Sequence, residues 1–352
     1  MSAAMKRTLL YIIAAFAAVS LCGCGGQKVD EGPARVIFET DLGNDVDDVL
    51  AMDMLYKYAD QGKIDLLAVM LNKVEHGALE FADVLREWYG YPDLPIGNIK
   101  EGADCSTDSK NYAEHVSQLK DSTGAPLFKG TGKDLSQTPM AVDLYRQILA
   151  DQPDASVTIV SVGFSTNLAR LLDTPADEYS DLTGRELVAR KVKALVTMAG
   201  CLLNDHTPEY NVMKDVPSAK KVFAEWPGKI VTSPFELGRE IVYPASSIEN
   251  DFGWAPLHPL VEAYKCYRPM PYDQMTWDLT SVLYGVEGDK DGAYFKVEGP
   301  GRIEVTDGAG MVYTSDPKGD RYYLVADGPQ GTNILNRFKE LITSKPASFK
   351  AE

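Results

Sequence analysis

An acidic segment at residues 39–48 places the strongest constraint on how this chain folds, because it holds five carboxylates within ten residues. The apolar run that precedes it, residues 34–38, is typical of a buried strand, and residues 49–56 have the apolar spacing of a helix. The acidic segment therefore lies where a strand ends and a helix begins, which is the usual ligand-binding position on an open α/β sheet.

The carboxylates of this segment lie so close together in the chain that the ionisation of one disfavours the ionisation of its neighbours. Like charges at such a spacing repel and raise one another's pKa unless a cation offsets them. Oxygen ligands at this density suit a hard cation, calcium before magnesium. An acidic helix cap with a solvated first turn explains one or two of the aspartates, but not five carboxylates around a bend at Gly43. The segment predicts a metal site.

The composition is that of an ordinary globular protein and argues against one class of partner. The 352 residues are 45% hydrophobic and 24% charged, and the formal net charge is −16. Binding to nucleic acid requires clustered lysine and arginine, and the sequence shows no basic stripe, so we expect no nucleic-acid partner. There is no internal repeat and no clear linker, which favours one domain over residues 34–345.

The N-terminus has the pattern of an export signal. Two basic residues precede an apolar run at 9–21, which is too short to span a bilayer as a mature helix. The run leads into Leu-Cys-Gly-Cys, which resembles a bacterial lipobox with Cys24 as the lipidated residue. We therefore expect a lipoprotein signal peptide at 1–23, a tether at 24–33, and a periplasmic or cell-surface protein held at the membrane by a lipid anchor only. A soluble secreted protein is the alternative.

Strand and helix patterns alternate along most of the chain. Each strand-like run is followed by a segment with helical spacing, and this alternation predicts an α/β fold with parallel strands and right-handed crossovers. The expected strands are 36–40, 64–70, 157–162, 192–198 and 229–232, with a short strand end at 95–98. The expected helices are 47–58, 78–88, 140–150, 166–172 and 218–226.

Two parts of the chain depart from this alternation. Residues 101–137 are polar and lack a strong period, so we expect loops there with one helix near 112–119. The C-terminal part predicts a different arrangement, with short antiparallel strands and a closing helix. Those strands are expected at 294–297, 302–305 and 322–325, and the helix at 334–342.

Several short motifs occur in the order in which a known family has them. The acidic turn is similar to the pattern D-x-D-P-G-x-D-D-x-x-A-L, Asn72 follows the second strand, and residues 162–169 read V-G-F-S-T-N-L-A. Farther along are M-A-G at 198–200, P-E-Y-N at 208–211 and M-T-W-D at 275–278. Taken together and in order, these motifs resemble the nucleoside hydrolases of the inosine-uridine-preferring type, over nearly the whole mature chain.

The resemblance implies both a fold and a reaction. The implied fold is an open, mostly parallel mixed sheet flanked by helices, a Rossmann-like architecture with a small antiparallel C-terminal appendage. The implied reaction is hydrolysis of the N-glycosidic bond of ribonucleosides to free base and ribose, with water activated by bound Ca²⁺ and by Asp41. Purine salvage and assembly into homo-oligomers are further implications of the family alone.

Matching positions also carry site roles into this sequence. The metal ligands by this match are two carboxylates of the acidic turn, a backbone carbonyl and a distant carboxylate: Asp41, which is also the catalytic base, Asp48, Val162 and Asp278. The residues that hold the sugar hydroxyls are Asp47, Asn72, Glu209 and Asn211.

The acidic turn departs from the family pattern in two ways. It is two residues longer, so Asp45 is an additional acid that could replace either Asp47 or Asp48. Glu39 stands where the pattern has its first aspartate, and a longer acid at that position is expected to support the others.

Trp277 stands where some members of the family have a histidine thought to protonate the departing base. An indole cannot act as that acid, but it can stack on a purine face. Simple packing of Trp277 is the alternative reading. His206, three residues before Glu209, is the best candidate for a substitute acid.

Two other functions compete with a nucleoside hydrolase. Without the histidine, the same fold and metal site would suit an exported protein that binds nucleosides or sugars with little or no turnover. A metal-dependent phosphohydrolase fits less well, because the turn lacks the D-x-D-x-T pattern of aspartyl phosphatases and no lysine-bearing phosphate loop is evident.

Overall fold

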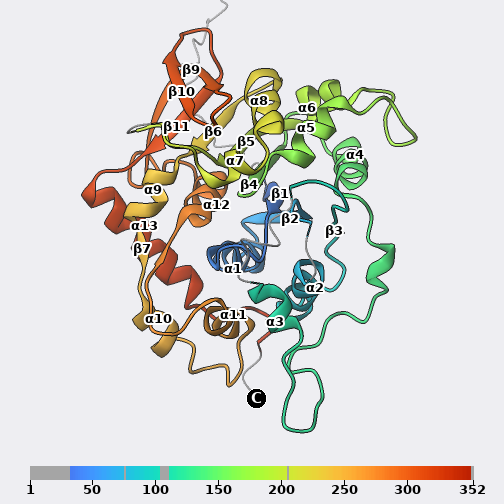
Figure 1. The fold of residues 1–352 in the computed structure, drawn as a ribbon, viewed down its shortest axis with the longest axis vertical. Helices are drawn as coiled ribbons and strands as arrows, with labels where there is room; N and C mark the ends of the chain where they lie inside the picture. The colour runs from blue at the N-terminus through green and yellow to red at the C-terminus, as the bar shows by residue number, and fades with distance from the viewer. Residues whose placement is uncertain (1–31, 75–76, 104–110, 204–205, 350–352) are drawn as a thin grey trace, which may run out of the picture. The chain divides into compact units, whose positions relative to one another are not determined.

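The computed structural model places strand β1 (Ala34–Thr40) near the middle of one nine-stranded sheet (Figure 1). The model describes residues 32–74, 77–103, 111–203 and 206–349. In order across the sheet, the strands are β10 (Met311–Ser315), β9 (Lys296–Val305), β11 (Arg321–Val325), β6 (Ile230–Ser233), β5 (Val192–Met198), β4 (Val157–Ser161), β1, β2 (Ile64–Leu71) and β3 (Ile96–Gly97).

Neighbouring strands run parallel from β3 across to β11, and β9 is antiparallel to both β10 and β11. Phe38 of β1 pairs with Val69 on one side and with Val160 on the other. All three side chains are buried. Continuous apolar strands of this kind are typical of parallel sheets that are covered on both faces.

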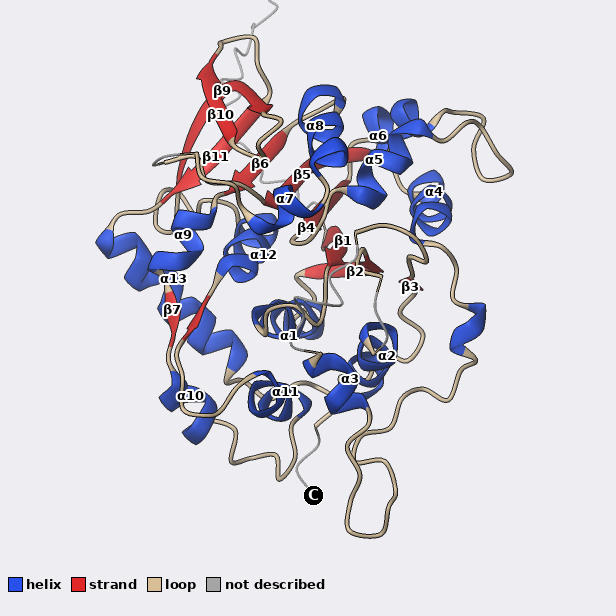
Figure 2. Cartoon of the chain, in the orientation of Figure 1, coloured by secondary structure: helices blue, strands red, loops and turns tan. Residues whose placement is uncertain are grey.

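Helices cover both faces of the sheet (Figure 2). Alternate residues of β1 enter two separate cores, Val36 and Phe38 on one face and Ile37 on the other, as the pleat of a strand requires. One core includes α1 (Asp47–Asp60), α2 (Ala78–Trp88), α11 (Pro259–Tyr267), α12 (Trp277–Glu287) and α13 (Gly328–Ile342). The other includes α4 (Ala141–Asp151), α5 (Thr166–Asp173), α6 (Gly184–Lys191) and α8 (Val216–Glu225).

The remaining elements are short. They are α3 (Tyr112–Ser117), a 3₁₀ turn at Leu135–Gln137, α7 (Tyr210–Lys214), α9 (Phe235–Glu240), α10 (Ala245–Asn250), and a two-stranded antiparallel sheet of β7 (Val242–Tyr243) and β8 (Gln274–Met275). The described residues from Pro33 onward form one compact unit. No helix within the described part of the chain is both long and apolar enough to cross a membrane.

The predicted fold class is confirmed, with differences near the C-terminus. The antiparallel strands continue the edge of the main sheet, residues 296–305 form one unbroken strand, and β10 has no counterpart in the sequence prediction. The helix α12 was also unexpected from the sequence. Its residues 278–283 are all buried, and a helix that is buried all round shows no apolar–polar period. The predicted signal peptide and anchor residue Cys24 lie outside the described residues.

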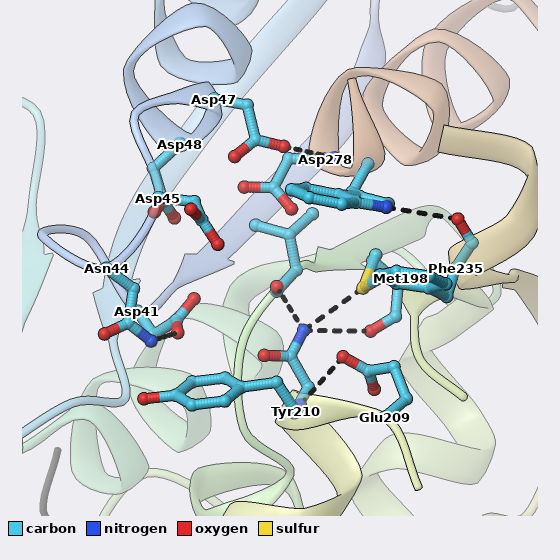
Figure 3. Close-up of a pocket in the computed structure, with 13 residues that line it drawn as sticks. Asp41, Asn44, Asp45, Asp47, Asp48, Met198, Glu209, Tyr210, Phe235 and Asp278 are labelled. Atoms are coloured by element: carbon cyan, nitrogen blue, oxygen red, sulfur yellow. Dashed lines mark hydrogen bonds between the residues drawn. The ribbon is translucent and has the colours of Figure 1, made fainter. Parts of the chain in front are cut away.

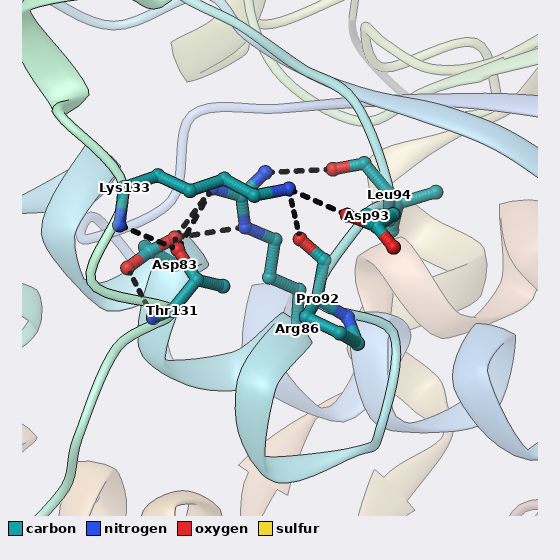
Figure 4. Close-up of polar contacts among 7 residues, drawn as sticks. All are labelled: Asp83, Arg86, Pro92, Asp93, Leu94, Thr131 and Lys133. Atoms are coloured by element: carbon teal, nitrogen blue, oxygen red, sulfur yellow. Dashed lines mark hydrogen bonds and ion pairs between the residues drawn. The ribbon is translucent and has the colours of Figure 1, made fainter.

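A long irregular segment between α3 and α4 is held against α2 by hydrogen bonds from Thr131 to Asp83, which also forms a buried ion pair with Arg86 within α2 (Figure 4). The side chains of Asp83 and Arg86 are only 6% and 8% exposed. Asp83 also accepts hydrogen bonds from the backbone N–H and the hydroxyl of Thr131, at 2.8 and 2.7 Å. Lys133 of the same segment pairs with Asp93 at 2.8 Å, and both of these side chains are well exposed.

This difference in burial predicts different effects on stability. Asp83→Ala leaves the Arg86 guanidinium buried without its partner, so we expect the free energy of unfolding to fall by about 3 kcal/mol or more. Lys133→Ala removes an exposed pair of the same segment and should cost less than about 1 kcal/mol. Chemical denaturation of both variants measures the two effects, and equal losses would contradict the role given to the Asp83–Arg86 pair.

Candidate active site

A pocket lies at the carboxyl ends of the parallel strands, where the strand order reverses between β1 and β4 (Figure 3). Such a switch point is the usual ligand position in open α/β sheets. The pocket encloses about 400 Å³ of space between protein atoms, part of which is open to solvent. It is lined by Asp41, Asn44, Asp45, Asp47, Asp48, Val162, Met198, Glu209, Tyr210, Asn211, Phe235, Trp277 and Asp278.

Asp278 enters the same pocket as the acidic turn, although it is 231 residues away from Asp47 in the chain. The backbone N–H of Asp278 donates to Asp47 Oδ2 at 3.1 Å, which joins the first turn of α12 to the first turn of α1. The side chains of Asp41, Asp47, Asp48 and Asp278 are all buried, and Asp45 is partly exposed. Asp278 and the aspartates of the acidic turn therefore converge in one pocket, as the sequence interpretation required.

Burial and mutual repulsion disfavour the ionised forms of these carboxyls. Burial is the main cause, and it raises the pKa of Asp47, Asp48 and Asp278 well above the ordinary value. Each of the three is raised further by neighbouring aspartates. Burial, opposed by the ammonium of Lys73, raises the pKa of Asp41 to about 7.

The donor set of the pocket fits a hard cation. Its polar lining is rich in carboxylate oxygens, and no lysine or arginine is among the described residues that line it. Among the residues that the structure describes, no three His, Cys, Asp or Glu side chains are close enough together to hold a metal ion as they stand. The aspartates are instead held by protein donors: Asn44 to Asp41, Thr40 to Asp48, the Asp278 N–H to Asp47, and Tyr267 to Asp45.

The opposite wall is made by the start of α7. Glu209 caps this helix, accepting from the N–H groups of Asn211 and Val212 at 2.8 and 3.3 Å, and it also accepts from the Gly200 N–H at 2.9 Å. Asn211 Nδ2 donates to the Val162 carbonyl at 2.8 Å. Figure 3 shows Glu209 across the pocket from Asp47 and Asp48. The E-Y-N motif therefore places an acid and an amide on the wall of the pocket that faces the aspartates.

Two of the predicted site residues lie behind the pocket. Asn72 is fully buried and is not among the lining residues. Its Nδ2 donates to Glu39 Oε1 and to the Phe164 carbonyl, each at 3.0 Å. Glu39 also accepts from the Tyr145 hydroxyl at 2.6 Å, and burial raises its pKa to about 7. Glu39 and Asn72 are therefore bonded to each other behind the pocket, and the sugar contact expected of Asn72 stays a prediction.

His206 and Trp277 differ in their relation to the pocket. His206 is exposed, in the loop before α7, and does not line it. Trp277 lines the pocket and stacks on Phe235, with ring centroids 5.4 Å apart and an interplanar angle of 21°. Its indole N–H donates to the Phe235 carbonyl at 3.1 Å, so this group is already engaged. Trp277 therefore packs against Phe235 and also lines the pocket, and its stacking on a purine base stays a prediction.

Sequence reasoning missed some of the lining. Phe235 follows β6 on a short helix, and no motif marks it. Asn44 lies inside the acidic turn, but the sequence interpretation assigned roles only to the acids around it. Met198 belongs to the M-A-G motif and Tyr210 to the P-E-Y-N motif.

A sequence model of one family matches residues 36–324. The chain belongs to the inosine-uridine preferring nucleoside hydrolase family. The resemblance seen in the sequence motifs is thereby confirmed, and with it the class of enzyme. No curated protein sequence matches the chain closely enough to be reported as a relative.

Solved structures have the same fold at low sequence identity. A plant nucleoside hydrolase is 18% identical, with a TM-score of 0.66, covering 89% of this chain and 100% of its own. A purine-preferring ribonucleoside hydrolase from Gardnerella vaginalis is 15% identical, with a TM-score of 0.65 and coverage of 88% and 98%. The inosine-uridine preferring nucleoside hydrolase from Bacillus anthracis is 16% identical, with a TM-score of 0.62 and coverage of 88% and 99%.

The buried carboxyls predict how stability depends on pH when a chelator removes divalent cations. Glu39 and Asp41 have folded pKa values of about 7, above their unfolded values of about 4. Between these values the folded state binds more protons than the unfolded state, so the free energy of unfolding falls as pH rises. We expect the Tm in chelator to fall from about pH 5 to about pH 7.5, as measured by calorimetry.

The control is Glu39→Gln, which keeps groups able to bond to Asn72 and Tyr145 but cannot ionise. This variant should lose less Tm over the same pH interval. Calcium should raise the Tm more at the higher pH, because carboxylate ligands must be deprotonated to bind it. A Tm in chelator that rises across this interval would contradict the assignment of buried, protonated carboxyls.

Proposed function

We propose that this chain hydrolyses the N-glycosidic bond of purine ribonucleosides to free base and ribose, with a calcium ion held in the pocket. The observation that carries the proposal is the convergence of Asp278 with the acidic turn in one buried pocket faced by Glu209 and Asn211. Family membership supports ribonucleoside hydrolysis in general. The ion and the purine preference are our own inference from the residues of this pocket.

Four groups would hold the ion, namely the carboxylates of Asp41, Asp48 and Asp278 and the carbonyl of Val162. When bound, a calcium ion supplies positive charge that makes a nearby water more acidic. Asp41 then accepts the proton of the water that attacks the sugar carbon. Asp41 must be ionised to accept this proton, and a bound cation would favour its ionised form.

The other wall of the pocket orients the sugar. Glu209 and Asn211 present an acid and an amide to ribose hydroxyls, and Asp47 accepts from a hydroxyl on the opposite side. Breaking the glycosidic bond places positive charge on the sugar ring, and the electron pair of that bond leaves with the base. A pocket lined with carboxylates stabilises such a charge and holds the ring in line with the attacking water.

Trp277 supports the choice of a purine. Its stacking on Phe235 and the hydrogen bond of its indole N–H fix the ring at the edge of the pocket. A fixed indole offers a flat surface on which the larger purine ring gains more contact than a pyrimidine. Arg239 lies over the Phe235 ring at 5.5 Å and adds to the rigidity of this aromatic pair.

Replacing Asp41, the proposed proton acceptor, should nearly abolish turnover. We expect Asp41→Asn to lower kcat for ribose release from inosine by at least about 10²-fold, because the proton acceptor is lost. Lys133→Ala, which is remote from the pocket, should leave kcat unchanged. Mass spectrometry of base and ribose measures both variants, and chelator should abolish release by the wild type. Undiminished release in chelator would refute the role of the ion.

A nucleoside-binding protein without turnover is the second candidate, favoured by one observation. No histidine is among the described residues that line the pocket, and the indole N–H of Trp277 is engaged. The same measurement separates the candidates. Tight binding of inosine with no free base would support the binding protein and refute the hydrolase.

The proposed stacking surface predicts a selective effect on purines. Trp277→Ala should raise KM for inosine and adenosine by about threefold to tenfold more than for uridine, because the lost aromatic contact is larger for a purine. Trp277→Phe keeps an aromatic face and should recover most of the difference. Steady-state kinetics on the three nucleosides decides the point, and equal changes in KM would show that Trp277 only packs against Phe235.

A further inference from the structure

The acidic turn between β1 and α1 holds Asp41 and Asp48 through its own Asn44 and Thr40, but these two bonds do not reach Asp45. Its own backbone contributes hydrogen bonds from Asn44 N–H to the Asp41 carbonyl at 3.3 Å and from Val49 N–H to the Val46 carbonyl at 3.2 Å. The turn is two residues longer than the family pattern, and the additional acid is Asp45. A turn of this length with long hydrogen bonds does not by itself define where the Asp45 side chain lies.

Two tyrosines from distant helices hold this turn. The hydroxyl of Tyr112, on α3, accepts from the Gly43 N–H at 3.2 Å and donates to the Asp45 carbonyl at 3.0 Å. The hydroxyl of Tyr267, at the end of α11, donates to Asp45 Oδ1. The two tyrosine rings meet edge to face, with centroids 5.8 Å apart. The backbone and the side chain of Asp45 are therefore held from outside the turn.

The surroundings of Asp45 explain why an external donor is required. Asp45 acts as a repelling charge on Asp41, Asp47 and Asp278, which lie around it in the pocket. Repulsion of this kind drives a partly exposed side chain toward solvent. A hydrogen bond from a hydroxyl to a carboxylate is among the stronger side-chain interactions and opposes that movement.

We propose that Asp45 is a substrate-orienting carboxylate of this site, and that Tyr267 and Tyr112 are positioning residues that act through it. The inference rests on the proposed function, because it assigns a further group to the same pocket. Asp45 lines the pocket and is partly exposed, so it is reachable by a ligand. Carboxyl oxygens accept hydrogen bonds, so the matching groups on a nucleoside are a sugar hydroxyl or a base N–H.

The structure supplies a matched control on the same helix. Tyr264 is also on α11 and is buried, but its hydroxyl has no hydrogen-bond partner among the described residues. Tyr264→Phe and Tyr267→Phe therefore each remove one hydroxyl from one helix. Only the second removes a bond to the acidic turn.

The test is a double-mutant cycle of Tyr267→Phe and Asp45→Ala, with Tyr264→Phe as control. The readouts are KM and kcat for ribose release from inosine, and inosine affinity by calorimetry. We expect Tyr267→Phe to raise KM about tenfold with kcat nearly unchanged, which is the size of a hydrogen bond to a charged group. In the Asp45→Ala background the same change should have no further effect, because the group on which it acts is gone.

The control should leave KM within about twofold of the wild type. Equal effects of Tyr264→Phe and Tyr267→Phe, or a full additional effect of Tyr267→Phe on the Asp45→Ala protein, would overturn the inference while the proposed function stands. A wild-type protein that neither binds inosine nor releases ribose would refute the proposed function and the inference with it. If Tyr267→Phe does not fold, Asp45→Ala decides, since an unchanged KM in that variant also overturns the inference.

Discussion

The mutual repulsion of buried carboxylates at the end of β1 is the constraint on which the rest of this structure depends. Asp41, Asp47, Asp48 and Asp278 are withdrawn from water into one pocket, where no lysine or arginine is among the described lining residues. Such a group of acids costs stability unless a cation or protons compensate it. The protein retains it at the switch point of its sheet, the place where a ligand reaches the strand ends.

The fold supports this strained pocket from several directions. Backbone donors hold Asp47 and Glu209, from α12 and from α7. Behind the pocket, Glu39 links Asn72 on the β2 side to Tyr145 on α4. These contacts come from elements far apart in the chain, so the site is fixed only when the whole sheet and its helices are assembled. Functional sites commonly store such strain, and the surrounding core compensates for it.

Much of the fold is predictable from the sequence because its central strands are continuous apolar runs. Residues 157–162 and 192–198 predict strands almost at their observed bounds, since both faces of a parallel sheet are buried. The helix α12 and the strand β10 are not predictable in this way. The first is buried all round and lacks a period, and the second is a five-residue edge strand whose identity depends on pairing with β9. For the candidate site, motif order alone brings Glu209 and Asn211 to the pocket, but it does not indicate Phe235.

The local residue pattern determines that a dense set of oxygen donors follows a buried strand, and the order of the motifs determines the family. These are properties of short segments and need no knowledge of long-range contacts. Only the tertiary structure decides which acids share the pocket, that Asn72 lies behind it, and that Trp277 stacks on Phe235. It also decides which donors hold Asp45, because Tyr112 and Tyr267 come from helices 155 residues apart in the chain and meet the turn only through packing.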